Sequence, residues 1–248
     1  MFIYNIYNKK KFVIYQIQDP DTKSLAYIIS DKKNSTAVIL DPVEDMVDYY
    51  IKFASKKNFE LNFTIDTHIH ADHISGSNKL VYLNKNCKYF MGSAGETKKI
   101  TNNLITDSST FNIGDIKLKA FHTPGHTKES FCYFLSPYLF TGDTVLINST
   151  GRTDLADGSP EMMYKSIFSN LINLDKKTII LPGHDYKGKF RSTLSEQMLD
   201  NPYLAAKDKA SFINLKKQQK LSDPEKICIS TKRNMQPIAL YKAFVQTC

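Results

Sequence analysis

The sequence predicts an α/β fold with two β-rich halves, each covered by helices. Runs rich in β-branched and aromatic residues recur as far as residue 181, and Asp, Pro, Lys and Asn residues typical of turns separate them. Between these runs lie stretches whose apolar residues recur at helical spacing. The six histidines of the chain fall in three short segments that each follow a predicted strand. This placement indicates that they converge at one edge of the sheet.

The first half is expected to begin with antiparallel strands. Strands are predicted at residues 12–17, 25–29, 37–40 and 61–65. Before the last of them, Met46, Tyr49 and Phe53 recur at helical spacing and predict a helix over residues 45–56. This helix should cover one face of the sheet.

The second half repeats the pattern of strands and covering helices. A short helix is predicted at residues 78–83, and strands at residues 88–91, 116–121, 131–135, 138–140 and 178–181. Met163, Ile167 and Leu171 predict an amphipathic helix over residues 160–174. From about residue 192 the chain is polar and helical. This tail should pack on the core, so that residues 1–248 form a single domain.

The composition is that of a globular protein, with 42% hydrophobic and 23% charged residues. No apolar run approaches the ~20 residues that a membrane-spanning helix needs, so no membrane association is expected. The formal charge of +8 comes almost wholly from lysines spread along the chain. We therefore expect a solvated surface and not a nucleic-acid-binding face.

The four cysteines form no CxxC pair, which argues against a thiolate zinc motif and favours a reducing compartment. A cytoplasmic protein is therefore expected, with the mitochondrion as the alternative if the source is eukaryotic. The first eighteen residues contain lysines but no Arg or Ser, whereas a cleavable mitochondrial presequence is rich in both. Residues 12–15 are expected to be a strand instead.

The three histidine segments carry the expected chemistry. They read Thr67-His68-Ile69-His70-Ala71-Asp72-His73, His122-Thr123-Pro124-Gly125-His126-Thr127 and Pro182-Gly183-His184-Asp185-Tyr186. Imidazole and carboxylate groups gathered on loops at strand ends are typical of a metal site. In the HxHxDH run, alternate side chains of an extended backbone point the same way, so that His68 and His70 can share a metal ion. Asp72 and His73 would then face a neighbouring site.

A carboxylate and two later histidines complete the candidate centre. Asp143 follows Gly142 at the end of a predicted strand, where it can bridge two metals or complete one site, and the small glycine allows close approach. His126 and His184 each follow a Pro-Gly pair. His122 precedes the first of these pairs and matches no ligand position, so it is expected to be a turn or supporting residue.

Together these motifs resemble the metallo-β-lactamase superfamily, over about residues 15–203. The resemblance implies an αββα sandwich. Within the superfamily the chain is most similar to the persulfide dioxygenases of the ethylmalonic-encephalopathy-protein type, also called sulfur dioxygenases. The residues that carry this closer likeness are Ile39-Leu40-Asp41-Pro42, the run from Thr67 to Ser77, Gly151-Arg152-Thr153-Asp154, His184-Asp185-Tyr186-Lys187-Gly188, and Glu196 followed by Asn201-Pro202.

This likeness implies one Fe(II) per chain, held by His68, His126 and Asp143. A triad of two histidines and one carboxylate leaves open positions on one side of iron, where a substrate sulfur and dioxygen bind next to each other. Glutathione persulfide and O2 would be the partners, and sulfite and glutathione the products. Four ligand-like side chains would orient the triad and hydrogen-bond water or oxygen: His70, Asp72, His73 and His184.

Two residues are candidates for binding glutathione. Tyr186 occupies the position of a tyrosine that contacts the peptide in related glutathione-using members. Arg152 can bind a glutathione carboxylate through both arms of its guanidinium. A salt bridge with Asp154 that shapes the loop is the other interpretation of Arg152.

The alternative function is a dinuclear hydrolase of glutathione thioesters that resembles glyoxalase II, with two Zn(II) or mixed Zn/Fe ions. All seven ligand residues are present: His68, His70 and His126 for one metal, Asp72, His73 and His184 for the other, and Asp143 as the bridge. The GRTD motif and the short tail after Tyr186 favour the dioxygenase.

The chain departs from its close relatives near its C-terminus. They carry a cysteine shortly after an Asn-Met pair, whereas this chain has Asn234-Met235-Gln236-Pro237, so a role of that cysteine has no counterpart here. A homodimer is compatible with the likeness. The nucleases of this fold carry an inserted domain that grips nucleic acid, and no stretch of this chain is long enough to supply one.

Overall fold

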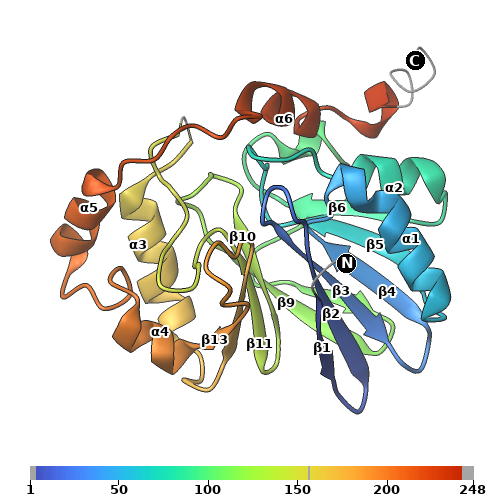
Figure 1. Ribbon diagram of the computed structural model, residues 1–248, viewed down its shortest axis with the longest axis horizontal. Coiled ribbons are helices and arrows are strands. Elements are labelled where there is room, and N and C mark those ends of the chain that lie inside the picture. Colours follow the sequence, from blue (N-terminus) through green and yellow to red (C-terminus); the bar gives the residue numbers. More distant parts are fainter. Residues whose placement is uncertain (1–3, 156, 242–248) are drawn as a thin grey trace.

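In the computed structural model, which describes residues 4–155 and 157–241, two β-sheets face each other and helices cover both outer faces (Figure 1). The first sheet has the order β1-β2-β3-β4-β5-β6-β7. Its strands are β1 (Tyr4–Asn8), β2 (Phe12–Gln18), β3 (Leu25–Asp31), β4 (Thr36–Leu40), β5 (Glu60–Asp66), β6 (Lys88–Gly92) and β7 (Leu104–Ile105). Pairing is antiparallel from β1 to β4 and parallel from β4 to β7.

The second sheet has the order β13-β12-β11-β10-β9-β8. Its strands are β8 (Thr110–Ile113), β9 (Ile116–His122), β10 (Phe131–Leu135), β11 (Tyr138–Gly142), β12 (Ile179–Pro182) and β13 (Ser192–Thr193). All neighbours are antiparallel except β11 and β12, which run parallel. The parallel step brings the ends of β11 and β12 to the same edge of the sheet.

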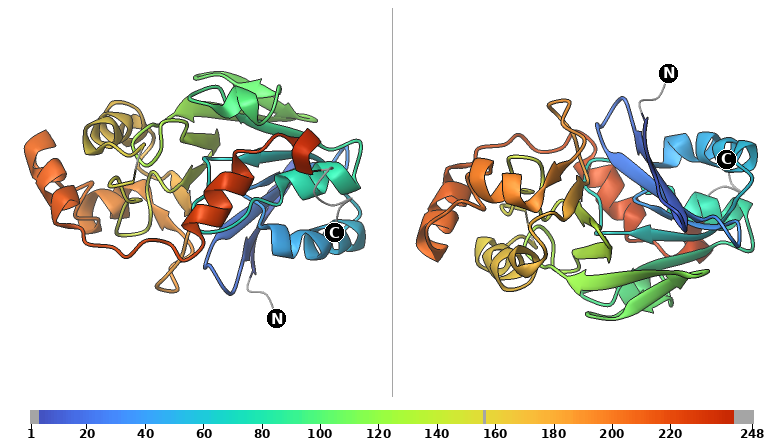
Figure 2. Two further views of the ribbon diagram at one scale, coloured as in Figure 1. Left: turned by 90° about the horizontal axis from the view of Figure 1, so that it is seen from above. Right: turned by 90° about the horizontal axis from the view of Figure 1, so that it is seen from below.

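Helices form the two outer layers. The first sheet is covered by α1 (Val47–Lys56) and α2 (Ser77–Leu83), and the second by α3 (Pro160–Ser169), α4 (Leu194–Asp200) and α5 (Lys209–Gln218) (Figure 1). Helix α6 (Ile227–Asn234) lies over one end of the sandwich, as the view from above in Figure 2 shows. These layers are the αββα sandwich that the sequence predicts.

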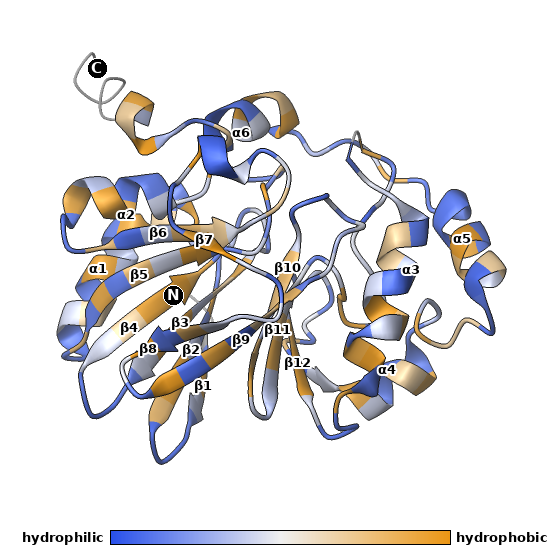
Figure 3. Cartoon of the chain, turned by 180° about the vertical axis from the view of Figure 1, so that it is seen from behind, coloured by the Kyte–Doolittle hydropathy of each residue, from blue (hydrophilic) through white to orange (hydrophobic). Residues whose placement is uncertain are grey.

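Successive side chains of each strand point to opposite faces of its sheet, so each sheet can pack against the other sheet on one face and against helices on the other. On β2, Ile14 points into the core between the sheets, whereas Tyr15 and Ile17 point to the other side, where they pack with residues of α1. On β9, buried residues alternate with exposed lysines, and Figure 3 shows this alternation in hydropathy. A third apolar cluster joins the second sheet to α3, α4 and α5 and includes Phe212 of the tail. Phe212 thereby connects α5 to the apolar core on this side of the second sheet.

Local signals explain where the helices begin. Ser159 caps α3 by accepting a hydrogen bond from the backbone N–H of Met162, and Pro160 occupies the first turn. Thr193 and Glu196 form a capping box at the start of α4. The predicted helix over residues 160–174 is too long, because α3 ends at Ser169 and a separate 3-10 turn, Leu171–Asn173, follows. Strands β1, β7, β8 and β13 were not predicted.

Three cysteines lie in the described part of the chain. Cys87 and Cys132 are buried and Cys228 is exposed, and all three are free thiols. Cys248 lies outside the described residues. Among the helices of residues 4–155 and 157–241, none has both the length and the apolar character needed to cross a membrane.

Candidate metal centre

Four strands end where the candidate ligands begin. Strand β5 leads into the HxHxDH run, β9 into the PGHT turn, β11 directly into Asp143, and β12 into His184. Because these strand ends meet at one edge of the sandwich, the fold brings together residues that are far apart in the sequence. The ligand atoms of His68, His126 and Asp143 lie within 4.8 Å of one another, as do those of His70, Asp72 and His73.

The hydrogen bonds of His68 leave its Nε2 atom free to bind a metal. The hydroxyl of Thr67 donates to Oδ2 of Asp41 at 2.9 Å, so the Nδ1–H of His68 donates to that hydroxyl oxygen at 2.9 Å. The lone pair of His68 is therefore on Nε2. Burial, together with the neighbouring His70 and His126, lowers the pKa of His68 well below its usual value, which keeps the ring neutral as a metal ligand requires.

His126 is oriented in the same way. Its Nδ1 lies 2.8 Å from the backbone carbonyl oxygen of Arg152, which only accepts, so Nδ1 carries the proton and Nε2 the lone pair. That Nε2 lies 3.7 Å from Oδ2 of Asp143. Burial raises the pKa of Asp143, but His184, His126 and His68 outweigh it and hold the pKa below its usual value. Asp143 is therefore an ionised ligand.

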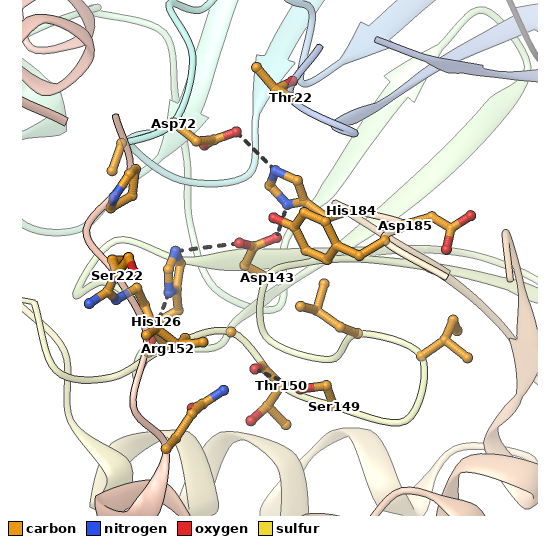
Figure 4. A pocket seen from close by; sticks show the side chains of 18 of the residues that line it. Thr22, Asp72, His126, Asp143, Ser149, Thr150, Arg152, His184, Asp185 and Ser222 are labelled. Carbon is orange, nitrogen blue, oxygen red and sulfur yellow. Dashed lines mark hydrogen bonds and ion pairs between the residues drawn. The ribbon is translucent and has the colours of Figure 1, made fainter. Parts of the chain in front are cut away.

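The other ligand-like residues are mostly engaged with one another. His184 lies between two carboxylates, with Nδ1 2.8 Å from Oδ1 of Asp143 and Nε2 2.9 Å from Oδ2 of Asp72 (Figure 4). Burial lowers the pKa of His184, but the two carboxylates outweigh it and raise the pKa well above its usual value. Nδ1 of His73 lies 3.0 Å from the same Oδ2 of Asp72.

Two buried ring nitrogens, Nδ1 of His70 and Nε2 of His73, have no hydrogen-bond partner among the described residues. The other nitrogen of His70, Nε2, lies 3.2 Å from Oδ1 of Asp41. Burial lowers the pKa of His70 to about 3, so this ring is neutral. An unpaired buried nitrogen is costly unless a metal ion, water or substrate satisfies it.

Sequence reasoning missed several residues that support this centre. Ser24, directly before β3, contacts Asp72, His73 and His184. Asn234, at the end of α6, donates from Nδ2 to the carbonyl oxygens of His70 and His73, each at 2.8 Å, and accepts from the N–H of Ser75 at 2.8 Å. No local motif marks either residue, because each acts through contacts far along the chain.

A carboxylate also ties two of the histidine segments together. Glu129, which is buried, follows the PGHT turn and accepts a hydrogen bond from the N–H of Ile69 at 3.0 Å. His122 faces away from the centre: its Nε2 lies 2.8 Å from the carbonyl oxygen of Lys128, and its ring packs on Phe131. This is the supporting role that the sequence predicts for His122.

A cavity of about 680 Å³ opens onto the centre. Asp72, His126, Asp143 and His184 line it (Figure 4), whereas His68, His70 and His73 are not among its lining residues and are almost fully buried. The outer walls come from the loop after Gly142, the loop after His184 and the segment between α5 and α6. Lys187, Lys189 and Lys226 line these walls.

Tyr186 and Arg152 both line the cavity, but the side chain of Arg152 is held by more polar contacts than that of Tyr186. Tyr186 exposes 66% of its surface and stacks on His184, with ring centroids 5.4 Å apart and planes 7° apart. Arg152 binds Asp154 through Nε and one terminal nitrogen at 2.7 and 2.8 Å, and its other terminal nitrogen donates to the carbonyl oxygen of Ser222 at 2.8 Å. The salt bridge with Asp154 is thus present, and both arms of the guanidinium are engaged.

Comparisons with known proteins agree with this arrangement. A model of the metallo-beta-lactamase superfamily matches residues 90–184. The mitochondrial persulfide dioxygenase ETHE1 of Bos taurus is 28% identical over 225 residues, which cover 90% of this chain and 87% of the relative. The crystal structure of ETHE1 from Myxococcus xanthus superposes with a TM-score of 0.85 at 29% identity, and the match covers 94% of this chain and 98% of that one.

A hydrolase is also among the relatives. The cytoplasmic hydroxyacylglutathione hydrolase of Arabidopsis thaliana is 32% identical over 171 residues, which cover 66% of this chain and 64% of the relative. The ETHE1 matches thus extend over more of the chain, and the hydrolase match has the higher identity over a shorter span.

Proposed function

We propose that this chain, which carries a metallo-β-lactamase domain and has the metallo-β-lactamase fold, is a persulfide dioxygenase. In the proposed reaction glutathione persulfide, O2 and water give glutathione, sulfite and two protons. The centre would be a single Fe(II) held by Nε2 of His68, Nε2 of His126 and a carboxylate oxygen of Asp143. The length of the ETHE1 matches supports this choice over other activities of the superfamily.

One observation carries the proposal: the lone-pair nitrogens of two histidines and one carboxylate oxygen converge as a triad. The hydrogen bonds of His68 and His126 fix Nε2 of each as the lone-pair nitrogen, and Oδ2 of Asp143 faces His126. By contrast, Oδ2 of Asp72 and both nitrogens of His184 are taken up by mutual contacts. Two histidines and one carboxylate are the donor set of non-haem Fe(II) oxygenases.

When bound, the iron would supply the electrons that activate dioxygen beside the substrate sulfur. The chain's own residues would position and shield the reactants. His184 holds Oδ1 of Asp143, so that the carboxylate presents Oδ2 to the site. The unpaired Nδ1 of His70 remains as an acceptor for water or substrate.

The cavity suits a tripeptide thiol. Its volume of about 680 Å³ lies within the range of roughly 300–1,000 Å³ typical of small-molecule sites. Tyr186 offers an exposed ring next to the centre, and Lys187, Lys189 and Lys226 place positive charge along the walls. We infer that the glutathione backbone lies over Tyr186 and that the lysines attract its carboxylates.

The alternative function is the dinuclear thioester hydrolase. It is favoured by the presence of all seven ligand residues and by the hydroxyacylglutathione hydrolase match. It requires Asp72 and His184 to turn away from their present contacts toward a second metal ion, whereas Nε2 of His73 already has no hydrogen-bond partner among the described residues.

Metal analysis and an oxygen electrode distinguish the two functions. Protein purified without added metal should contain about one iron per chain and should consume oxygen when glutathione persulfide is added, with sulfite as product. A glutathione thioester should be a poor substrate. Two zinc ions per chain, together with thioester hydrolysis and no oxygen uptake, would replace the dioxygenase by the hydrolase.

A further inference from the structure

The proposed single-iron site leaves a complete second set of ligand residues without a metal. Oδ2 of Asp72 contacts both His73 and His184, Nε2 of His73 has no partner among the described residues, and one more side chain joins this set. Oγ of Ser24 lies 3.0 Å from Oδ2 of Asp72, 3.1 Å from Nδ1 of His73 and 3.1 Å from Nε2 of His184. The hydroxyl thus contacts one ligand-type atom of each residue of the set.

The backbone fixes Ser24 in this place. Ser24 and His184 form an antiparallel β-bridge, and the N–H of Leu25 donates to the carbonyl oxygen of Gly183 at 2.8 Å. The Ser24 side chain is buried, and its Oγ also lies 2.7 Å from the hydroxyl oxygen of Thr22. The backbone contacts thus hold the Cβ of Ser24 beside the set, and burial together with the contact to Thr22 limits where the hydroxyl can turn.

The distances within the set are those of hydrogen bonds. Oδ2 of Asp72 is 2.9 Å from Nε2 of His184 and 3.0 Å from Nδ1 of His73. Four ligands around a tetrahedral zinc ion with bonds of about 2.0–2.2 Å stand roughly 3.3–3.6 Å apart. A metal ion bound by Asp72 and His184 would therefore require these two side chains to spread, and the Ser24 hydroxyl, which contacts both, helps to hold them together.

We propose that Ser24 is a specificity-determining residue that keeps Asp72, His73 and His184 as a hydrogen-bonded network and so excludes a second metal ion. The inference rests on the proposed single-metal function. Removing the hydroxyl takes away the contact that all three side chains share and leaves space where the hydroxyl was. The ligand atoms of these side chains can then move apart to the separation that a metal ion requires, and they can bind a second ion together with Asp143.

The test measures zinc stoichiometry. Metal-free protein is saturated with Zn(II), excess metal is removed, and bound zinc is counted by mass spectrometry for the wild type, Ser24→Ala and Ser24→Thr. We expect about one zinc in the wild type and in Ser24→Thr, which keeps the hydroxyl, and about two in Ser24→Ala. Ser24→Gly is measured alongside, and circular dichroism identifies any variant that does not fold.

Two further variants locate the added ion. Ser24→Ala combined with Asp72→Asn should return to about one zinc, because the second set then lacks its carboxylate. Thr22→Ala removes a neighbouring hydroxyl that touches none of the three ligand-type residues and should stay at about one. If folded Ser24→Ala and Ser24→Gly both hold one zinc, Ser24 does not exclude the second ion.

Oxygen uptake separates this inference from the proposed function. If the wild type consumes oxygen with glutathione persulfide but Ser24→Ala still holds one zinc, the inference about Ser24 is wrong and the proposed function stands. Wild-type protein that holds two zinc ions and hydrolyses thioesters without oxygen uptake would overturn both.

Discussion

The backbone of Gly142 lies directly against the side chain of Thr67, so that a β-carbon at residue 142 would stand 2.5 Å from Oγ1 of Thr67. Gly142 also has a φ of +47°, a conformation that side chains disfavour. The same Thr67 hydroxyl orients His68, and Gly142 precedes Asp143. The contact therefore sets the distance between two segments that supply ligands.

Gly142→Ala should disturb both stability and metal binding. The positive φ alone costs roughly 1–2 kcal/mol, and displacement of Thr67 should add to this and move His68. Gly188→Ala is the matched control, because Gly188 has a φ of +75° but a β-carbon added there would meet no atom within 4 Å. Thermal unfolding and metal content are measured for both. Equal loss of stability, with metal retained in both, would show that the contact with Thr67 is unimportant.

Asp143→Ala should lose metal as well as activity, because Asp143 supplies the carboxylate of the proposed triad. His122→Ala is the control: its ring contacts Lys128 and Phe131 outside the centre, so it should retain metal. Metal content after purification checks both variants. Full iron occupancy in Asp143→Ala would show that the ligand assignment is wrong.

Asn234→Ala should loosen the HxHxDH run and the turn after it, because the buried amide satisfies two carbonyl groups and one N–H there. Each backbone group left unpaired costs about 1–3 kcal/mol, so the unfolding free energy should fall by roughly 3 kcal/mol or more. Metal affinity should fall with it. Asn78→Ala, which removes a single hydrogen bond to the carbonyl oxygen of Gln236, should have a smaller effect. Denaturant titrations compare the two, and equal losses would contradict the role assigned to Asn234.

Arg152→Lys tests whether this arginine binds substrate or holds its loop. Since both arms of the guanidinium are engaged with Asp154 and Ser222, we expect a lower melting temperature and equal damage with glutathione persulfide and with a small persulfide that lacks the peptide. Asp154→Asn should have a similar effect, and the double variant should be no worse than either. A roughly tenfold rise in KM for the glutathione substrate alone, at unchanged melting temperature, would instead indicate carboxylate binding.

The metal-free protein should lose stability as the pH falls below about 6.5. His68 is held neutral with its pKa well below the usual value, and the pKa of His70 is lowered to about 3. At His70 the unfolded chain therefore binds more protons than the folded chain between about pH 3 and 6.5, which lowers the unfolding free energy by up to about 1.4 kcal/mol per pH unit there. His68 acts in the same direction.

The pKa of His184 is raised in the folded protein, so this histidine stabilises the fold at low pH. That stabilisation is lost as the pH rises above the usual pKa of a histidine. Chemical denaturation of metal-free protein from about pH 4 to 9 should therefore show a maximum near pH 6.5. Constant stability over that range would mean that these histidines do not titrate differently on unfolding. Metal-loaded protein serves as the comparison, since bound metal removes the nitrogens of His68 from titration.

The two β-rich layers with covering helices could be predicted from the sequence, and the ligand-type residues could be proposed from it, because both depend on short-range patterns. A continuous run of β-branched and aromatic residues marks β2, alternating apolar residues mark β9, and the HxHxDH spacing marks His68 and Asp72 without knowledge of the fold. Short edge strands such as β7 and β13 lack such a pattern, because two residues show no period. That residues 1–248 form one domain stays a prediction.

The supporting residues could not be found from the sequence. Ser24 and Asn234 are ordinary polar residues, and their partners His184 and His70 lie 160 and 164 positions away. The sequence also left two roles for Arg152, because a GRTD loop is compatible with an internal salt bridge and with the binding of a substrate carboxylate. Only the fold shows which side chains meet.

The hydrogen bond from Asn234 to His70 has a consequence for the order of folding. It joins residues 164 positions apart, and closing so large a loop costs more chain entropy and is slower than pairing neighbouring strands. The β-hairpins should therefore assemble first, and the HxHxDH run should gain its final geometry among the last steps. In a refolding experiment, tight metal capture should lag behind the recovery of sheet structure.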